Sequence, residues 1–374
     1  MQTIPYWLDY PYEPRPALEQ KIEADACVIG AGVGGVSCAR ELARRGFDTV
    51  VLEARTVASG ASGRNGGFLL TGGAPFHVDA RERWGHQPAR RLYARTVEVQ
   101  RELYALAEEL GAAEYLRRVG SLRLATSEQE AEHVRRHVEL LREDGFAAEL
   151  VERDELEPIL RGIGHAGCLV DHDGALQPAR WIRALAEDAE RAGARIYENT
   201  PVRLDDPPVK ATHTVLAADG ALAALVPAVK ARRLHMIATA PVPEHVVSTL
   251  VYARYGYDYF QQTPDGRIAL GGFSDLDGEA SYTDAEEGSP AVWQRLEQYL
   301  HEDLGLTDAE TTHRWVGIVG FSDGERPFAG QVEDGLYALG GYSGHGNLIG
   351  FMAGRAVAEM IVTGESSDLD VLAL

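Results

Sequence analysis

The segment from Asp25 to Glu53, DACVIGAGVGGVSCARELARRGFDTVVLE, constrains the fold more than any other part of the chain. Its pattern predicts a short apolar strand, a glycine turn, an amphipathic helix and a second apolar strand that ends in an acid. In such a βαβ unit Gly30 allows a tight turn, Gly32 lets the backbone approach a pyrophosphate, and Gly35 lets the helix pack close to the strand. The segment therefore has the order of elements that a dinucleotide requires.

Two further features of this segment support that interpretation. The N-terminus of the predicted helix directs free N–H groups and its positive dipole end toward the phosphates. Glu53 follows Gly30 by 23 residues, where a carboxylate can accept hydrogen bonds from an adenosine ribose. Dinucleotide binding is therefore favoured over a purely structural βαβ unit.

The residues that follow Glu53 favour a flavin over a nicotinamide. The stretch from Ala54 to Phe68 reads ARTVASGASGRNGGF and is rich in glycine and serine. A nicotinamide-dependent dehydrogenase does not need a second loop here, whereas a flavin enzyme uses backbone groups to wrap the ribityl chain and the isoalloxazine edge. The sequence also shows no second strand, glycine turn and helix in this order that could form a nicotinamide domain.

With this loop the chain resembles the D-amino-acid oxidase superfamily of FAD-dependent amine oxidoreductases. The resemblance is strongest to the branch that holds the gamma-glutamylputrescine oxidoreductases, whose loop also reads GASGRNGG, together with glycine and sarcosine oxidase-like enzymes. The C-terminal part matches the same family in its W-x-G, D-x-x-x-P-x-x-G and GHG motifs, at 315–317, 323–330 and 344–346. The resemblance implies that FAD is the cofactor.

The family resemblance also implies the fold: an α/β chain (α+β overall) with a Rossmann-like FAD-binding domain of the glutathione-reductase type and an antiparallel-sheet substrate domain. The FAD-binding domain is expected to be discontinuous, over 1–80, 146–230 and 325–374, with the substrate domain over 81–145 and 231–324. Apolar periodicity predicts helices over 78–111 and 127–145, a helix within 174–197 that ends at Gly193, and a helix over 347–363. Strands are predicted at 121–126, 195–198, 214–218, 232–240, 255–262, 267–273 and 336–339. Residues 1–24 are predicted to form an extended arm.

The residues expected at the cofactor follow from the two glycine-rich regions and from the resemblance. Val202 is expected beside the adenine, and the N-terminus of the 347–363 helix is expected to stabilise negative charge at the flavin pyrimidine edge. The full set is Gly30, Gly32, Val33, Gly34, Gly35, Glu53, Ala54, Arg55, Ala61, Ser62, Arg64, Asn65, Gly66, Gly67, Phe68, Val202, Ala218, Gly341, Gly344, His345, Gly346, Asn347 and Leu348. By resemblance Trp315 and Arg326 also lie near the flavin.

Two local departures from the family pattern concern this cofactor region. Only 12 residues separate Val202 from Val215, where relatives usually carry a longer β-meander. Asp219 and Gly220 follow the strand TVLAA at a point where many relatives have a second small residue. Neither departure removes the cofactor site.

The candidate substrate residues lie in the predicted hairpin YARYGYDYFQQTPDGRIALGGF, over 252–273. Amine oxidation by a flavin needs an aromatic or apolar wall and one or two polar anchors more than a strong base. Tyr259, Arg254 and His345 are the candidate catalytic residues, with Tyr257 and Phe260 as further wall candidates. Arg254 is suited to bind a carboxylate. Each has a structural alternative: packing for the aromatic residues, a solvated surface position for Arg254 and a structural role for His345.

The resemblance to monomeric sarcosine oxidases also excludes some features of those enzymes. They tether FAD through a cysteine near the D-x-x-x-P stretch, but this chain has no cysteine after Cys168, so FAD is expected to be non-covalent. Leu348 stands where they hold the substrate carboxylate with a lysine, and the 267–271 strand has no lysine to activate oxygen. Sarcosine-type binding is therefore disfavoured.

Composition limits the partners and the compartment. A net charge of −21 argues against nucleic acid or an anionic membrane as a partner. The three cysteines have neither metal nor redox spacing, and no membrane-spanning or secretory segment is apparent, so a cytoplasmic location without a bound metal is expected.

These observations predict an FAD-dependent oxidoreductase that oxidises a C–N bond of a small amine or amino acid and passes electrons to O₂ or another acceptor. Two alternatives stay open: a flavin dehydrogenase subunit that serves a partner protein or quinone, and a non-catalytic FAD-binding protein. The sequence does not identify the amine or an oligomer interface.

Overall fold

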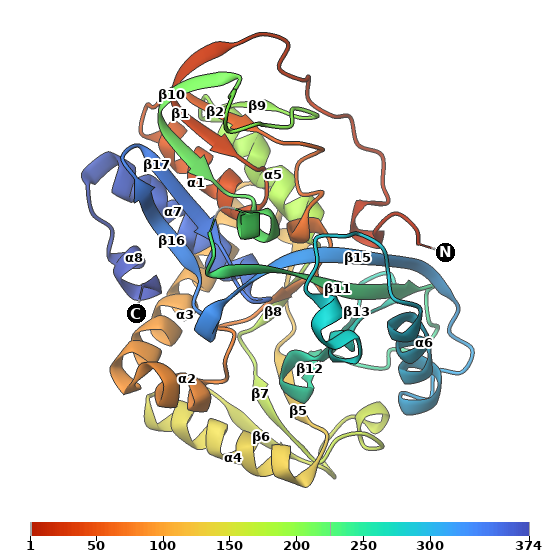
Figure 1. Ribbon diagram of the computed structural model, residues 1–374. Coiled ribbons are helices and arrows are strands. Elements are labelled where there is room, and N and C mark those ends of the chain that lie inside the picture. Colours follow the sequence, from red (N-terminus) through yellow and green to blue (C-terminus); the bar gives the residue numbers. More distant parts are fainter. Residues whose placement is uncertain (1, 225, 374) are drawn as a thin grey trace.

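Two large β-sheets organise the chain, and the computed structural model describes residues 2–224 and 226–373 (Figure 1). The first sheet has six strands, in the order β16-β17-β10-β1-β2-β9, and the second has eight, in the order β15-β11-β14-β13-β12-β5-β7-β6. A small three-stranded sheet, β3-β8-β4, completes the set. This mixed α/β architecture confirms the predicted fold class.

The six-stranded sheet contains the predicted βαβ unit. Its parallel strands are β9 (Arg195–Tyr197), β2 (Thr49–Leu52), β1 (Ile22–Ile29), β10 (Val209–Leu216) and β17 (Leu336–Gly340), and β16 (Phe328–Glu333) pairs antiparallel at one edge. All four residues of β2 are buried, as expected for a parallel strand covered on both faces. Helices α1 (Val33–Arg44), α5 (Pro178–Arg191) and α7 (Gly346–Thr363) pack beside this sheet (Figure 1).

The eight-stranded sheet is antiparallel except where β12 pairs with β5. Its strands are β15 (Thr311–Ser322), β11 (Val229–Thr239), β14 (Ile268–Gly272), β13 (Asp258–Gln262), β12 (Leu250–Ala253), β5 (Ser121–Ala125), β7 (Ala166–Val170) and β6 (Glu149–Glu152). Helix α4 (Glu128–Glu143) lies along β5, β6 and β7, and α6 (Pro290–Gln298) lies along β11 and β14. The strands predicted at 232–240, 255–262 and 267–273 are confirmed, although β13 begins only at Asp258, because Arg254–Gly256 form a short 3-10 helix, η6.

Two predicted helices differ from the structure. The helical pattern over 78–111 is divided into α2 (His77–Trp84) and α3 (His86–Glu109), because Gly85 adopts a φ of +92°. The start of the 174–197 segment is a strand, β8 (Gly174–Leu176), which pairs with β3 (Phe68–Leu69) and β4 (Leu116–Arg118); helix α5 begins only at Pro178. The small sheet thereby ties the loop after Glu53 to the middle of the chain. Helix α8 (Ser367–Leu372) follows α7 at the C-terminal end.

The N-terminal arm is fixed to the molecule at both of its aromatic clusters. The Trp7 side chain is 2% exposed, and its Nε1 donates a hydrogen bond to the Asn65 carbonyl oxygen at 2.7 Å. Tyr12 and the Arg15 backbone N–H donate to the carboxylate of Glu198, which is fully buried. The arm therefore supports the loop that follows Glu53.

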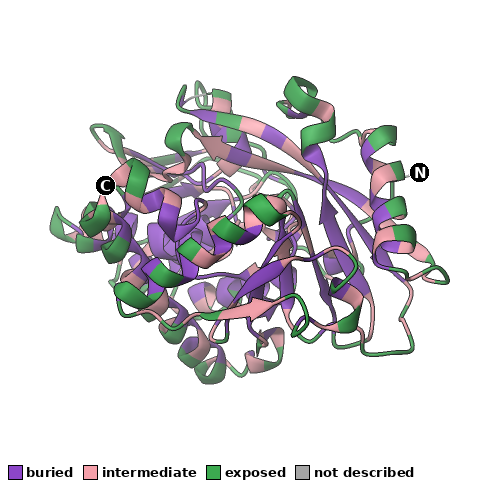
Figure 2. Cartoon of the chain, turned by 90° about the horizontal axis from the view of Figure 1, so that it is seen from below, coloured by how far each residue is buried: buried purple, intermediate pink, exposed green. Residues whose placement is uncertain are grey.

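The buried residues form two main clusters that follow the two sheets. The first joins α1, α5 and α7 to the six-stranded sheet, and the second joins β11–β14 to α6; Figure 2 shows the strands mostly buried and the outer helix faces exposed. Strands β6 and β7 fall within the stretch 146–230 that was assigned to the FAD domain, yet they belong to the eight-stranded sheet. The domain boundaries stay a prediction. Within residues 2–224 and 226–373, no helix is both long enough and apolar enough to cross a bilayer.

Candidate active site

A cavity of about 580 Å³ lies where the carboxyl ends of β1, β2 and β10 meet the eight-stranded sheet. Ile29, Leu52 and Ala217 line it from the first sheet, and residues of β11, β12, β13 and β15 line it from the second. Open α/β sheets bind ligands outside the carboxyl ends of their strands. The cavity therefore lies where a dinucleotide is expected.

The turn after β1 places backbone donors at one end of this cavity. Gly30 has a φ of +106°, and a Cβ there would lie 2.6 Å from the Ala217 carbonyl oxygen, so the turn requires glycine. The Val33 N–H donates to the Ser62 hydroxyl at 3.0 Å, which brings the second glycine-rich loop over the N-terminus of α1. Gly34 also lines the cavity, and its N–H group has no partner within the helix, because it belongs to the first turn. This donor and the helix N-terminus suit a pyrophosphate.

Glu53 occupies the end of β2 and also lines the cavity. Its Oε2 accepts a hydrogen bond from the Ala31 N–H at 2.9 Å, and its Oε1 accepts one from the Arg55 N–H at 2.9 Å. The carboxylate is thus held by the glycine turn on one side and by the following loop on the other. Each oxygen keeps a lone pair for a ribose hydroxyl.

A pair of asparagines joins the two glycine-rich regions across 282 residues of sequence. The Asn65 Nδ2 donates to Asn347 Oδ1 at 3.2 Å, and the Asn347 Nδ2 donates to Asn65 Oδ1 at 3.1 Å and to the Phe68 carbonyl oxygen at 2.8 Å. Asn347 lies in the first turn of α7. The pair therefore sets the N-terminus of α7 against the loop after Glu53.

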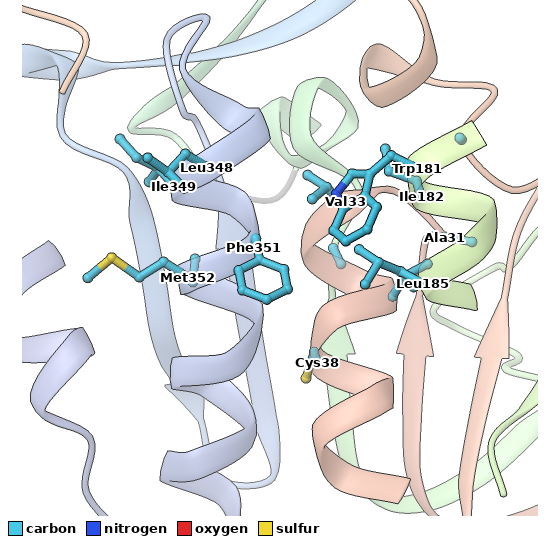
Figure 3. Packing of buried hydrophobic residues seen from close by; sticks show 14 of the residues in the cluster. Ala31, Val33, Cys38, Trp181, Ile182, Leu185, Leu348, Ile349, Phe351 and Met352 are labelled. Carbon is cyan, nitrogen blue, oxygen red and sulfur yellow. The ribbon is translucent and has the colours of Figure 1, made fainter. Parts of the chain in front are cut away.

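Small residues allow α7 to approach α1 closely. Figure 3 shows the larger buried side chains that pack beside the two helices. A Cβ at Gly354 would overlap the Gly34 carbonyl oxygen, and a Cβ at Gly350 would lie 2.8 Å from a Val33 methyl group. Phe351 and Val33 belong to the same buried cluster beside this contact. The close approach brings the N-termini of both helices to one cavity.

Tyrosines from neighbouring strands form a wall on the other side. Tyr252 of β12 pairs in register with Tyr259 of β13, and both line the cavity. The Tyr259 ring packs edge-on against Phe68 at a centroid distance of 5.9 Å and lies against Gly66. Burial raises the pKa of Tyr252 to about 12 and that of Tyr259 still further. Both hydroxyls are therefore neutral at ordinary pH.

His345 precedes α7 and faces the same space. Its ring lies 5.9 Å from that of Tyr252, and its Nδ1 is buried without a hydrogen-bond partner among the described residues. Burial, together with the positive charge of Arg123, lowers the pKa of His345 to about 4. The imidazole is therefore neutral near pH 7.

Asp219 is a cavity residue that the sequence marked only as a departure from the family pattern. Its carboxylate accepts hydrogen bonds from the Gly320 N–H at 3.0 Å and the Gly341 N–H at 3.1 Å. Burial raises its pKa to about 6 in spite of these bonds. Asp219 thus ties β15 and the turn before α7 to the end of β10.

Most residues predicted at the cofactor line this one cavity. Those that do are Gly30, Gly32, Val33, Gly34, Glu53, Ala54, Arg55, Ala61, Ser62, Arg64, Asn65, Gly66, Phe68, Val202, Ala218, Gly344, His345, Gly346, Asn347 and Leu348, with Tyr257 and Tyr259 on the substrate side. Those that do not are Gly35, Gly67, Gly341, Arg254, Phe260, Trp315 and Arg326.

The residues outside the lining have identifiable structural positions. Arg254 pairs with Asp258 at 2.5 Å and Asp275 at 3.1 Å, so its charge is already balanced. Phe260 is fully buried in the second cluster. Trp315 Nε1 donates to the Arg64 carbonyl oxygen at 2.9 Å, and Arg326 stacks over Trp84. A direct substrate role for Arg254 is therefore not supported by its position.

Sequence reasoning missed Tyr252, Arg83, Arg232 and Tyr342 among the lining residues. Tyr252 had a usable signal, because it opens the same tyrosine-rich hairpin as Tyr259. The two arginines had none, because arginine is common throughout this sequence. Tyr342 lies beside Gly34, and its buried hydroxyl has no hydrogen-bond partner among the described residues.

The donor set fits FAD. One cavity is bordered by glycines that leave no room for a Cβ and by two helix N-termini. Tyr342 and His345, which each have a buried polar atom without a partner among the described residues, also line it. No group of three or more His, Cys, Asp or Glu side chains in 2–224 and 226–373 is arranged to hold a metal ion. The glycine turn and the two helix N-termini suit a cofactor with a phosphate region.

Comparison with known proteins agrees with this geometry. Residues 25–360 match the family described as "DAO: FAD dependent oxidoreductase". The gamma-glutamylputrescine oxidoreductase of Escherichia coli (strain K12) is 28% identical over 97% of this chain and 89% of its own length. The glycine oxidase of Geobacillus kaustophilus (strain HTA426) is 27% identical over 92% of this chain and 94% of its own length.

Comparison with solved structures shows a shared fold. The crystal structure of glycine oxidase from Geobacillus kaustophilus superposes with a TM-score of 0.76 at 24% identity, covering 92% of this chain and 96% of that one. The matched family covers nearly the whole chain and includes both cavity-forming glycine motifs. The protein belongs to the DAO family of FAD-dependent oxidoreductases, whose matched members act on amines and amino acids.

Proposed function

We propose that this FAD-dependent oxidoreductase oxidises the C–N bond of a small amine or amino acid inside the cavity, and that water then hydrolyses the imine product. The observation that carries the proposal is the single cavity that joins a dinucleotide-binding end to a tyrosine-lined end. Its relatives include enzymes named for glycine and for gamma-glutamylputrescine, which are both amines.

The cofactor region would be held by the α1 turn, Glu53, the loop over 61–68 and the N-terminus of α7. FAD supplies the two-electron acceptor for the amine when it is bound. The N–H groups in the first turn of α7, including those of Asn347 and Leu348, would stabilise negative charge on a ligand placed against them.

On the substrate side, the chain's own groups bind, orient and exclude water. Tyr252 and Tyr259 form a wall of neutral rings. The neutral imidazole of His345 lines the cavity, and its unprotonated ring nitrogen can accept a hydrogen bond from an amine N–H. With its pKa at about 4, His345 orients the amine and is a weak base for removing a proton from an ammonium ion.

A second candidate is a dehydrogenase that passes electrons to a partner protein or quinone in place of O₂. Lys21, Lys210 and Lys230 each have side chains more than half exposed, and none of them lines the cavity. A lysine ammonium beside the cofactor, which would favour oxygen reduction electrostatically, is thus absent from the lining. Slow reoxidation in air with fast reduction of an artificial acceptor would favour this candidate.

The cellular compartment is proposed from the cysteines. Cys27, Cys38 and Cys168 are buried and unpaired. Burial raises the pKa of Cys27 to about 12, so its thiol is unreactive. Three buried cysteines without a disulfide support a reducing compartment such as the cytoplasm.

The test is the visible spectrum of the purified protein, followed anaerobically as amines are added. The panel contains gamma-glutamylputrescine, polyamines, glycine, sarcosine, and D- and L-amino acids. We expect flavin bands at about 375 and 450 nm that bleach with at least one amine. Bands that persist through the whole panel would favour the partner-dependent enzyme or a non-catalytic FAD protein, and would contradict the proposal.

A further inference from the structure

Four arginines line the cavity, and three of them have carboxylate partners. Arg55 and Arg64 share Glu286, with N···O distances of 2.8 and 3.0 Å, and Arg83 pairs with Glu325 at 2.5 Å. Arg232 is the fourth. No carboxylate among residues 2–224 and 226–373 lies within 4.0 Å of its guanidinium nitrogens.

Arg232 is also well buried. It is 9% exposed, on strand β11, where it stands in register with Val319 of β15. Its Nε donates to the Ser281 hydroxyl at 3.1 Å, and in the described part of the chain its two Nη atoms have no acceptor. Because Arg232 lines the cavity and its Nη atoms are not among the enclosed atoms without a partner, they are open to an incoming anion.

The surroundings of Arg232 are aromatic. Its Cζ lies 5.7 Å from the ring centroid of Tyr257 and 5.3 Å from those of Tyr282 and Phe321. Cation–π contacts of this kind orient a guanidinium but contribute less than a desolvated ion pair. The rings also cannot accept hydrogen bonds from the in-plane Nη–H groups in the way that a carboxylate does.

The adjacent arginine on the same strand behaves differently. Arg233 pairs with Asp277 at 3.1 Å and does not line the cavity. The chain therefore supplies a carboxylate to the arginine that faces away from the cavity and leaves the one that faces into it unpaired. The missing anion is expected to come from a ligand.

We propose that Arg232 binds the carboxylate of the amine substrate, so that the enzyme selects amines that carry a carboxylate over amines with neutral groups. This inference rests on the proposed amine oxidation. The two Nη donors match the two oxygens of a carboxylate, and the single unbalanced positive charge matches its single negative charge. A phosphate group carries more charge than this site balances.

Arg232 and the glycine turn that suits the FAD phosphates have different neighbours. The contacts of the α1 turn are Ala217, Leu52 and Ser62. The neighbours of Arg232 are different: Tyr257, which follows η6, Phe321 of β15, and Ser281. The glycine turn and the arginine therefore serve different parts of the cavity.

The test compares the FAD-loaded wild type with Arg232→Met, Arg232→Lys and the matched control Arg233→Met. Acetate, acetamide and inorganic phosphate are titrated into each oxidised protein, and the flavin difference spectrum gives the dissociation constants. The ratio of flavin to protein is measured for every variant. Anaerobic reduction is then followed with the amino acid that bleaches the flavin fastest and with its carboxamide.

We expect saturable acetate binding in the wild type, weakened about 100-fold in Arg232→Met and partly restored in Arg232→Lys. Acetamide should bind weakly to all the proteins, and Arg233→Met should bind acetate like the wild type. In reduction, Arg232→Met should raise the apparent Kd of the amino acid by a similar factor and leave that of the carboxamide unchanged.

Several results would overturn the inference. Equal acetate binding by Arg232→Met and the wild type would make Arg232 a structural residue held by its aromatic neighbours. Loss of bound FAD in Arg232→Met alone would assign the arginine to the cofactor, and tighter binding of phosphate than of acetate would overturn the choice of carboxylate. A wild type that binds FAD and acetate but is reduced by no amine would instead contradict the proposed function, and the two failures are thus distinguishable.

Discussion

The two ends of the cavity are built in different ways. The cofactor end uses backbone groups and absent side chains: Gly30 turns the chain, and Gly34 and Gly354 let two helices meet. The substrate end uses long side chains such as Tyr252, Tyr259 and Arg232, which come from three different strands of the eight-stranded sheet. One end is thus determined by what the backbone requires, and the other by which side chains the sheet brings together.

This difference predicts where substitutions act. A change at the cofactor end should disturb the fold and the bound FAD together, because the same glycines serve both. A change at the substrate end should alter ligand binding and leave the fold largely intact.

Gly354→Ala should destabilise the protein by about 3 kcal/mol and lower its FAD content. The added Cβ would overlap the Gly34 carbonyl oxygen and lie 2.9 Å from the Cys38 backbone nitrogen, so α7 must move away from α1. Helix propensity alone predicts the opposite, because alanine is favoured over glycine within a helix by about 1 kcal/mol. Chemical unfolding and the flavin-to-protein ratio measure the two effects.

Gly162→Ala is the matched control, since a Cβ there would meet nothing within 4 Å. It should leave both stability and FAD content close to those of the wild type. If Gly354→Ala were as stable as this control, the close contact between α1 and α7 would not be needed for the fold of the cofactor end. The claim that the two ends of the cavity are built differently would then fail.

His345→Gln should reduce the dependence of stability on pH. Burial lowers the pKa of His345 to about 4 in the folded protein, below the ordinary value of 6.5, so the unfolded chain binds the extra proton between these values. The stability from neutral His345 is therefore complete above pH 6.5 and is lost as the pH falls toward 4. In that window the wild type should lose up to about 1.4 kcal/mol more per pH unit than the variant.

Urea unfolding at a series of pH values from 4 to 7.5 measures this difference. Burial also lowers the pKa values of His77, His137 and His235, and these residues titrate in the same direction. The comparison between wild type and variant isolates His345, because the other histidines are common to both. Parallel pH profiles would show that His345 is hydrated and charged in the folded protein, and its role as a neutral acceptor would be excluded.

The sequence predicted the two ends to different degrees, for the same physical reason. A pyrophosphate turn needs glycine at fixed spacing, so the motif over 25–53 identified its own contacts and β1, α1 and β2 followed the prediction. Arg254 and Arg232 both belong to β-rich segments, and only the structure shows that Asp258 and Asp275 pair with Arg254 whereas Arg232 is unpaired. Whether an arginine finds a carboxylate partner depends on tertiary contacts, and no fixed spacing in the sequence reveals such contacts.

The break at Gly85 and the short strand β8 have a similar explanation. An isolated glycine is tolerated in a helical pattern, so the division of 78–111 into two helices was not visible from periodicity. Strand β8 has three residues and exists because it pairs with β3 and β4. Elements this short depend on tertiary partners, which the local sequence does not encode.

The Asn65–Asn347 pair is the smallest test and the most specific, because it is a side-chain contact within the end that glycine dominates. Each single change to alanine should destabilise the protein by about 1 kcal/mol, since each removes hydrogen bonds between the loop and α7. In a double-mutant cycle the two changes should be non-additive by at least about 0.5 kcal/mol, because both break the same pair. Additive effects would mean that the glycine contacts alone hold the N-terminus of α7 at the cavity, and FAD content should then be unchanged in the double variant.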